Sequence, residues 1–280
     1  MPLSVIDLYR DVLPKTNCQK CGFKTCLAFA SMVISEKLPL EKCPYLSPEA
    51  LVACKAELQA QYAAGKWTKK DMAQDALEWA KQRSASMNIN DMPKRIGGRL
   101  VNRDGQPALE LPYLNTAILV TGNSITHQDG RPLTRWEQVF IYNHMAQGGS
   151  SSPTGNWKGL VEFPNTVSKI KSMKSHVETP LKVAFKGKIQ ELRKAAAKLG
   201  GQDMTEQIGS ADVALYFQVL PRVPVVLMFW GSEPEDELEA AAKLLFDETI
   251  IDHLDIESIM FVSERLQQLL TGTAHEDPVN

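Results

Sequence analysis

The chain has 280 residues, a formal net charge of −2 and 44% hydrophobic residues. This composition is typical of a globular protein and excludes a disordered chain, and the near balance of 31 basic and 33 acidic residues gives no reason to expect a nucleic-acid partner. No apolar run reaches the roughly 18 residues that span a bilayer, the longest being Val223 to Trp230. We therefore expect a cytoplasmic protein without a membrane span, with one sizeable core and a small additional module.

A short helix is predicted to lead into a cluster of cysteines. Apolar residues recur at helical spacing from Ser4 to Leu13, and Pro14 ends the pattern. Four cysteines then follow at the spacing C-x2-C-x4-C-x16-C-P, namely Cys18, Cys21, Cys26 and Cys43. Three thiols within nine residues cannot share one side of a helix or strand, so we expect a loop wrapped around a group that binds thiolate. The Cys-Pro ending is that of bacterial ferredoxin motifs, which favours one [4Fe-4S] cluster held by these four cysteines.

Three other interpretations of the cysteines remain open. Structural zinc in a four-thiolate cage normally uses two C-x2-C pairs, and the second pair is missing. Disulfides are not expected, because Met1 to Asp11 has no basic region, no long apolar stretch and no cleavage site of a secretory signal. Unrelated buried cysteines would rarely cluster so tightly. Lys15, Lys20 and Lys24 surround the loop and either offset the charge of a cluster or dock an acidic redox partner.

The cysteine segment also carries a family resemblance. NCQKCGFKTCLAFA followed by CPYL resembles the small iron-sulfur domain of the corrinoid iron-sulfur protein large subunit of anaerobic acetyl-CoA metabolism, and a related form occurs in the Rnf complex B subunit. The resemblance implies that Cys18, Cys21, Cys26 and Cys43 ligate one [4Fe-4S] cluster that passes single electrons. It covers only about Leu3 to Leu46, and the chain is too short for the barrel and cobalamin domain of that protein. The corrinoid-carrier function is therefore not expected here.

Three further helices are predicted before the second domain. The first begins near Cys26 and runs to Leu38, which would place the third ligand at its first turn, where the helix dipole favours an anion. Ser47 is a predicted N-cap for a helix to about Tyr62, which carries the fifth cysteine, Cys54, outside the ligand spacing. A helix from Thr68 to Ser84 follows. We interpret residues 47–84 as a helical bridge between a four-cysteine iron-sulfur module at 1–46 and a larger domain.

The larger domain, at 85–270, is predicted to mix strands and helices. The expected elements in chain order are an antiparallel meander over 96–126, helices over 133–145, 167–177 and 188–199, a hairpin of 211–220 with 223–230, and closing helices over 235–246 and 256–270. The helix at 167–177 should stop before Pro180. Residues 148–159 form a glycine-rich stretch that we interpret as a connecting loop, and 271–280 a mobile tail. This order of elements predicts the α+β class.

From about Ala76 onward the chain resembles a second family, found mainly in anaerobes and catalogued as a domain of unknown function. The matching segments include IGGRLVNRDGQPALELP and WEQVFIYNHMAQGG. This resemblance implies a domain boundary but no activity.

The five histidines give no paired metal-ligand spacing, so they predict no second metal site. His144 follows an apolar helical face and is expected to be packed or capping. His253 lies among carboxylates that would suit a ligand or a general base, but a solvated, charged helix end is the default interpretation. Catalytic residues are not identifiable from the sequence.

We therefore expect a cytoplasmic [4Fe-4S] protein of an anaerobe that carries one electron. Its expected partners are a ferredoxin-like donor and a corrinoid or other acceptor, and we expect the α+β domain to engage the acceptor. Two rival hypotheses remain. One is an adaptor or redox sensor that needs the cluster but has no catalysis, and the other is an enzyme with a substrate pocket in the α+β domain.

Overall fold

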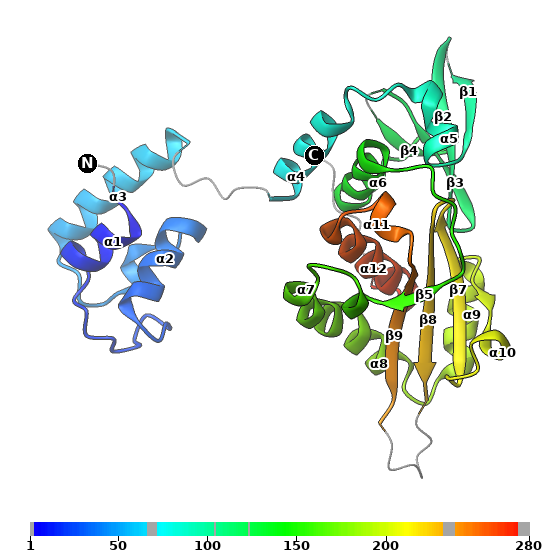
Figure 1. Ribbon diagram of the computed structural model, residues 1–280. Helices are drawn as coiled ribbons and strands as arrows, with labels where there is room; N and C mark the ends of the chain where they lie inside the picture. The colour runs from blue at the N-terminus through cyan, green and yellow to red at the C-terminus, as the bar shows by residue number, and fades with distance from the viewer. Residues whose placement is uncertain (1–2, 66–71, 104, 123, 232–238, 274–280) are drawn as a thin grey trace. The chain divides into compact units, whose positions relative to one another are not determined.

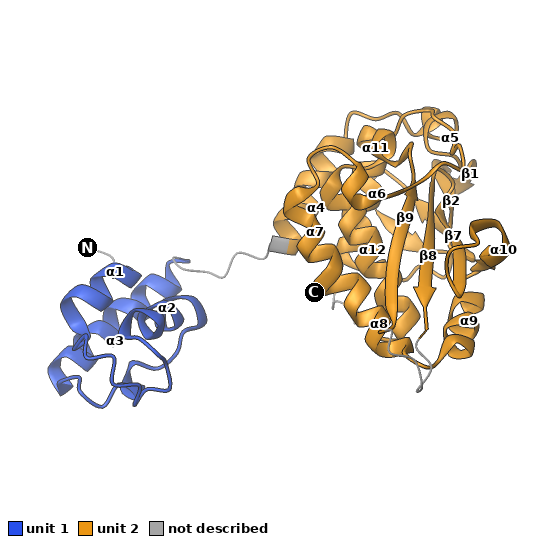
Figure 2. Cartoon of the chain, turned by 60° about the horizontal axis from the view of Figure 1, so that its bottom comes forward, with its two compact units in different colours: residues 1–72 blue, residues 73–280 orange. Residues whose placement is uncertain are grey.

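The computed structural model describes residues 3–65, 72–103, 105–122, 124–231 and 239–273. It divides into two compact units, Met1–Met72 and Ala73–Asn280 (Figure 2). Helices and antiparallel sheets are both present, so the predicted α+β class is confirmed (Figure 1). No described helix is long and apolar enough to cross a membrane.

The regular secondary structure described in the first unit is helical. Its elements are α1 (Val5–Asp7), the π-helical segment η1 (Leu8–Val12), α2 (Cys26–Glu36), the 3-10 turn η2 (Leu40–Lys42) and α3 (Pro48–Ala63). A loop over 13–25 separates η1 from α2. Side-chain caps start each α-helix: Thr25 accepts from the Ala28 N–H at 3.0 Å, and Ser47 accepts from the Ala50 N–H at 3.2 Å. The helices predicted over 4–13, 26–38 and 47–62 are therefore present.

The core of the first unit joins α3 to α2. Cys54 and Leu58 of α3 are buried in the same cluster as Phe29 and Val33 of α2. The Tyr62 hydroxyl donates to the Val33 carbonyl at 2.6 Å, which fixes the C-terminal part of α3 on α2. The division between the units falls inside the predicted bridge, so α3 belongs to the first unit. The predicted start of the next helix, at Thr68, lies outside the described residues.

The described residues of the second unit form two antiparallel sheets. The first has the order β1-β2-β3-β4 and confirms the predicted meander; its strands are β1 (Arg99–Arg103), β2 (Gln106–Tyr113), β3 (Thr116–Val120) and β4 (Ile125–His127). The second has the order β5-β9-β8-β7-β6, with β5 (Trp157–Gly159), β6 (Gln202–Asp203), β7 (Val213–Leu220), β8 (Val223–Trp230) and β9 (Ala241–Asp247). The β7-β8 pair is the predicted hairpin.

The predicted helix at 235–246 is wrong, because its described part is the strand β9. Alternate side chains of this segment, Ala242, Leu244 and Phe246, are buried, which is the period of a strand. Ala, Lys and Leu are strong helix formers, but β9 pairs with β8 on one side and β5 on the other, and this tertiary pairing overrides the local preference.

Helices cover the sheets of the second unit, and α12 packs with both α6 and α8 (Figures 1 and 2). The helical elements are α4 (Met72–Ser84), η3 (Ile89–Asp91), α5 (Met92–Arg95), α6 (Arg135–Gln147), η4 (Leu160–Glu162), α7 (Val167–Ser172), η5 (Met173–Glu178), α8 (Thr179–Phe185), α9 (Ile189–Lys198), α10 (Thr205–Ile208), α11 (Ile250–His253) and α12 (Ile256–Thr271). The helices predicted over 133–145, 188–199 and 256–270 are thus confirmed.

The helix that begins at Val167 does not stop before Pro180 as predicted. It passes through the π-helical segment η5 and continues as α8 to Phe185. Pro180 stands in the first turn of α8, where its missing N–H and its ring are tolerated after the wider π turn.

Candidate metal centre

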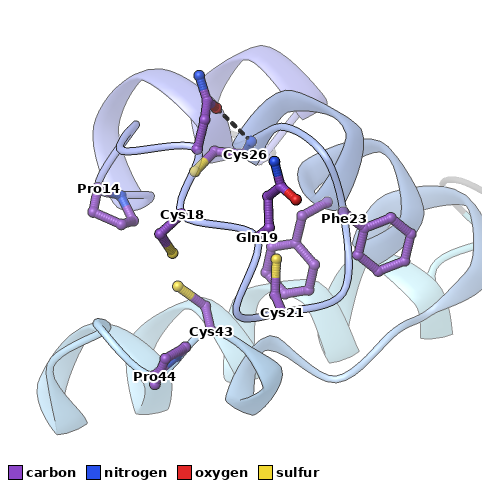
Figure 3. A pocket seen from close by; sticks show the side chains of 10 residues that line it. Pro14, Cys18, Gln19, Cys21, Phe23, Cys26, Cys43 and Pro44 are labelled. Carbon is purple, nitrogen blue, oxygen red and sulfur yellow. Dashed lines mark hydrogen bonds between the residues drawn. The ribbon is translucent and has the colours of Figure 1, made fainter.

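The four predicted ligands line one pocket in the first unit (Figure 3). The other lining residues are Pro14, Asn17, Gln19, Phe23, Phe29 and Pro44. All four thiols are free, and Figure 3 shows the Cys18 and Cys43 side chains pointing toward one another. Among the described residues, the lining offers sulfur donors, the two amide side chains of Asn17 and Gln19 and apolar surface, but no carboxylate or imidazole.

The backbone of the ligand loop is tightly coiled. Lys15, Asn17 and Gln19 have positive φ angles of 57°, 50° and 63°, and Gly22 has 87°. Left-handed residues turn the chain sharply, and glycine is the residue that does so without steric cost. The short spacing between Cys18 and Cys21 can therefore present both thiols to one pocket.

The third ligand begins a helix, as predicted. Cys26 is the first residue of α2, and its N–H donates to Asn17 Oδ1 at 2.9 Å, the dashed line in Figure 3. This bond fixes the loop against the helix N-terminus, whose partial positive charge favours an anionic group. Cys43 comes from a separate segment, and its N–H donates to the Leu40 carbonyl at 3.0 Å at the end of η2.

The four ligands differ in exposure and in electrostatic environment. Cys26 and Cys43 are each 6% exposed, Cys21 is half-buried and Cys18 is exposed. The pKa of Cys18 is lowered, first by a backbone hydrogen bond at Lys20 and then by the Thr16 side chain. The pKa of Cys43 is raised, first by burial and further by the other three cysteines. Four thiolates in this space would repel one another unless they shared a positively charged group.

The donor set fits an iron-sulfur cluster, because such clusters are held by cysteine thiolates. Among the described residues, no three His, Cys, Asp or Glu side chains form a group that could hold a single metal ion. The assignment therefore rests on the four thiols, their spacing and their common pocket. Cys54 does not line this pocket; it is 8% exposed within the core of the first unit, and burial raises its pKa.

The three lysines of the ligand loop are exposed. Lys20 Nζ lies 5.0 Å from the centroid of the Tyr45 ring, which joins the loop to the segment after Cys43. Lys15 Nζ donates to the Arg10 carbonyl at 2.8 Å. The loop that carries Cys18 therefore exposes three positive charges.

A pair of histidines in the second unit was not predicted as a cluster. His144 and His253 are both fully buried, with ring centroids 5.4 Å apart. His144 Nδ1 lies 3.1 Å from the His253 carbonyl, and His253 Nε2 lies 2.9 Å from the Ser151 carbonyl. Since a carbonyl only accepts, each of these nitrogens carries the proton. Burial lowers the pKa of His144 to about 3, and it also lowers the pKa of His253.

The expected packing of His144 is confirmed, whereas a solvated helix end at His253 is wrong. The Ser151 carbonyl that contacts the His253 ring belongs to the glycine-rich stretch at 148–159, and hydrogen bonds hold this stretch in place. Asp247 accepts from the N–H groups of Thr154 at 2.9 Å and Gly155 at 2.6 Å. Sequence spacing gives no signal for this contact, because the partners are about a hundred residues apart.

The four thiols and the comparison with known proteins both indicate that this chain is an iron-sulfur protein. Residues 13–45 match a family described as "Putative Fe-S cluster". Residues 88–268, well over half of the chain, match the family described as Domain of unknown function (DUF3786). The chain belongs to the DUF3786 family.

Similarity to curated proteins is short. The chain is 48% identical over 56 residues to the "Corrinoid/iron-sulfur protein large subunit" of Moorella thermoacetica, covering 20% of this chain and 12% of that protein. It is 42% identical over 45 residues to the "Acetyl-CoA decarbonylase/synthase complex subunit gamma" of Methanocaldococcus jannaschii, covering 16% and 9%. The subunit gamma of Methanothermobacter thermautotrophicus is 47% identical over 47 residues, covering 17% and 10%.

The chain thus spans about a tenth of the length of these relatives. No solved structure matches it significantly. The expected resemblances, to the corrinoid iron-sulfur protein and to a domain of unknown function, are both confirmed.

Proposed function

We propose that the first unit holds one [4Fe-4S] cluster on Cys18, Cys21, Cys26 and Cys43 and carries one electron at a time. The observation that carries this proposal is the meeting of four thiols, from the ligand loop and from the separate Cys43 segment, at one pocket. Three ligands close in sequence and a remote Cys-Pro are the arrangement of bacterial ferredoxin clusters, whereas zinc cages use two paired knuckles.

The chain's own residues would hold the cluster and set its surroundings. Cys26 and Cys43 lie in the core of the unit, so two ligands are fixed by packing. Phe23 and Phe29 also line the pocket, with ring centroids 5.9 Å apart, and shield one part of it from water. When bound, such a cluster supplies reversible one-electron chemistry, whose potential depends on hydrogen bonds and solvent exposure.

The partners we propose are a ferredoxin-like donor and a corrinoid or other acceptor in the cytoplasm of an anaerobe. The relatives support this choice, since their names describe a corrinoid/iron-sulfur protein and a decarbonylase/synthase complex. They match only over short stretches, so their whole activity is not carried over.

Anaerobic reconstitution of the full chain tests the cluster type directly. We expect about four irons and four sulfides per chain, and visible absorption that bleaches on reduction and returns on oxidation. Zinc as the bound metal, with no iron retained, would overturn the proposal.

A sensor or adaptor role is the second candidate, and one observation favours it. Cys26 and Cys43 belong to the hydrophobic core of the first unit, so cluster loss would disturb its packing. Repeated reduction and oxidation distinguishes the two functions. A cluster that survives cycling supports the electron carrier, whereas one that breaks down at the first reduction supports the sensor.

A further inference from the structure

One cluster ligand is at the protein surface, and the other three are not equally accessible. Cys18 is exposed, whereas Cys26 and Cys43 are each 6% exposed and Cys21 is half-buried. Residues 15–20 form an uninterrupted exposed stretch around Cys18. Since a carrier protein can approach only from solvent, the edge of the pocket at Cys18 offers the shortest path for an electron.

The loop that carries Cys18 has charged side chains of one sign. Residues 14–25 contain three lysines and no aspartate or glutamate, and all three lysines are exposed. The Lys20 ammonium lies over the Tyr45 ring at 5.0 Å, and Tyr45 itself is 50% exposed. This contact holds a positive charge and an exposed aromatic ring beside the exposed ligand.

An exposed ligand beside an aromatic ring, on a loop that carries lysines and no acidic residue, suits a transient redox partner. Such complexes bury little surface, so long-range attraction provides much of the encounter rate. Because Cys26 and Cys43 are buried, a partner would reach the pocket at the Cys18 edge.

We propose that the cysteine loop docks an acidic one-electron carrier protein through its exposed residues Cys18, Lys20 and Lys24, with the Tyr45 ring beside Lys20, and that the electron enters at the Cys18 edge. This inference rests on the proposed electron-transfer function and adds the docking surface and the charge of the partner. The reduced carrier loses one electron and the cluster site gains it, without a bond broken or a proton transferred.

Binding of an acidic bacterial ferredoxin to the cluster-loaded full chain tests the proposal. The variant is Lys20→Glu/Lys24→Glu, and the control is Lys171→Glu/Lys194→Glu, which makes the same charge change at exposed positions of the second unit. At low ionic strength we expect about tenfold weaker binding for the loop variant and less than about twofold for the control. The difference should shrink in about 0.3 M salt, where the Debye length is well below 10 Å.

Three results would overturn the docking surface. Equal weakening by both variants would indicate unspecific charge attraction. Unchanged binding by the loop variant would show that the carrier protein does not dock at this surface. Unchanged binding with a shifted midpoint potential would show that the lysines only offset the charge of the cluster.

Iron content and the reduced spectrum, measured on the same samples, separate this proposal from the one on which it rests. If the wild-type protein holds no reversibly reducible cluster, the proposed function itself fails. If the cluster cycles normally and only the lysine effect is missing, the docking surface alone fails. Should the charge-reversed variant load less iron, Lys20→Gln/Lys24→Gln repeats the binding test with a milder change.

Discussion

Two buried cysteines of the first unit provide a matched test of the ligand set. Cys43 is 6% exposed and lines the pocket, whereas Cys54 is 8% exposed, lies in α3 and does not line it. Cys43→Ala and Cys54→Ala remove the same sulfur atom from similar burial. The packing cost should therefore be similar in both, at about 1 kcal/mol for one methylene-sized group.

The two variants should differ sharply in iron. We expect Cys54→Ala to keep about four irons per chain and to lower the melting temperature of the first unit by roughly 4–8 °C, as about 1 kcal/mol does in a domain of this size. Cys43→Ala should lose the cluster, because one of its four ligands is gone. The assay is iron and sulfide analysis after anaerobic reconstitution, with thermal unfolding followed by circular dichroism. Equal loss of iron in both variants would refute the ligand assignment and point to core packing instead.

Three further predictions concern stability. The first is a pH dependence due to His144, whose pKa falls from 6.5 to about 3 on burial. Between these two pH values only the unfolded chain takes up the proton. Lowering the pH from about 6.5 to 3 should therefore destabilise the second unit by up to roughly 5 kcal/mol. Urea unfolding of His144→Gln should show a shallower pH dependence than the wild type. Second, Gly98→Ala should destabilise the second unit by more than about 1 kcal/mol, and by more than Gly105→Ala does. Both glycines have a positive φ. An added Cβ would lie 2.6 Å from the Glu110 carbonyl oxygen at Gly98, whereas at Gly105 it would meet nothing within 4 Å. Chelating the iron should make the first unit sensitive to limited proteolysis while a fragment of about 73–270 resists, and degradation of the whole chain would contradict independent units.

The elements predicted correctly are those whose signal is local. Thr25 and Ser47 cap helices that begin where the sequence predicts, and the β7-β8 hairpin turns at Pro221-Arg222. The four cysteines were also recognisable in the sequence, because their spacing and the Cys-Pro ending resemble those of iron-sulfur motifs. Their common pocket follows from a coiled loop and one remote residue.

The features missed from the sequence depend on distant partners. The segment from Ala241 to Asp247 has the composition of a helix and becomes a strand only because β8 and β5 lie on either side of it. His253 lies among charged residues in sequence, but the Ser151 carbonyl removes its ring from solvent. The helix continues through Pro180 because a π-helical turn precedes it, and no residue pattern predicts that turn.

A reversible one-electron cluster in the first unit would be visible in an anaerobic redox titration followed by electron paramagnetic resonance. Reduction of the reconstituted full chain should produce a signal of about one spin per chain that disappears on oxidation and returns over several cycles. The signal should be absent from Cys43→Ala and retained in Cys54→Ala. A protein that binds zinc alone, or whose iron is released at the first reduction, would contradict the electron-carrier account.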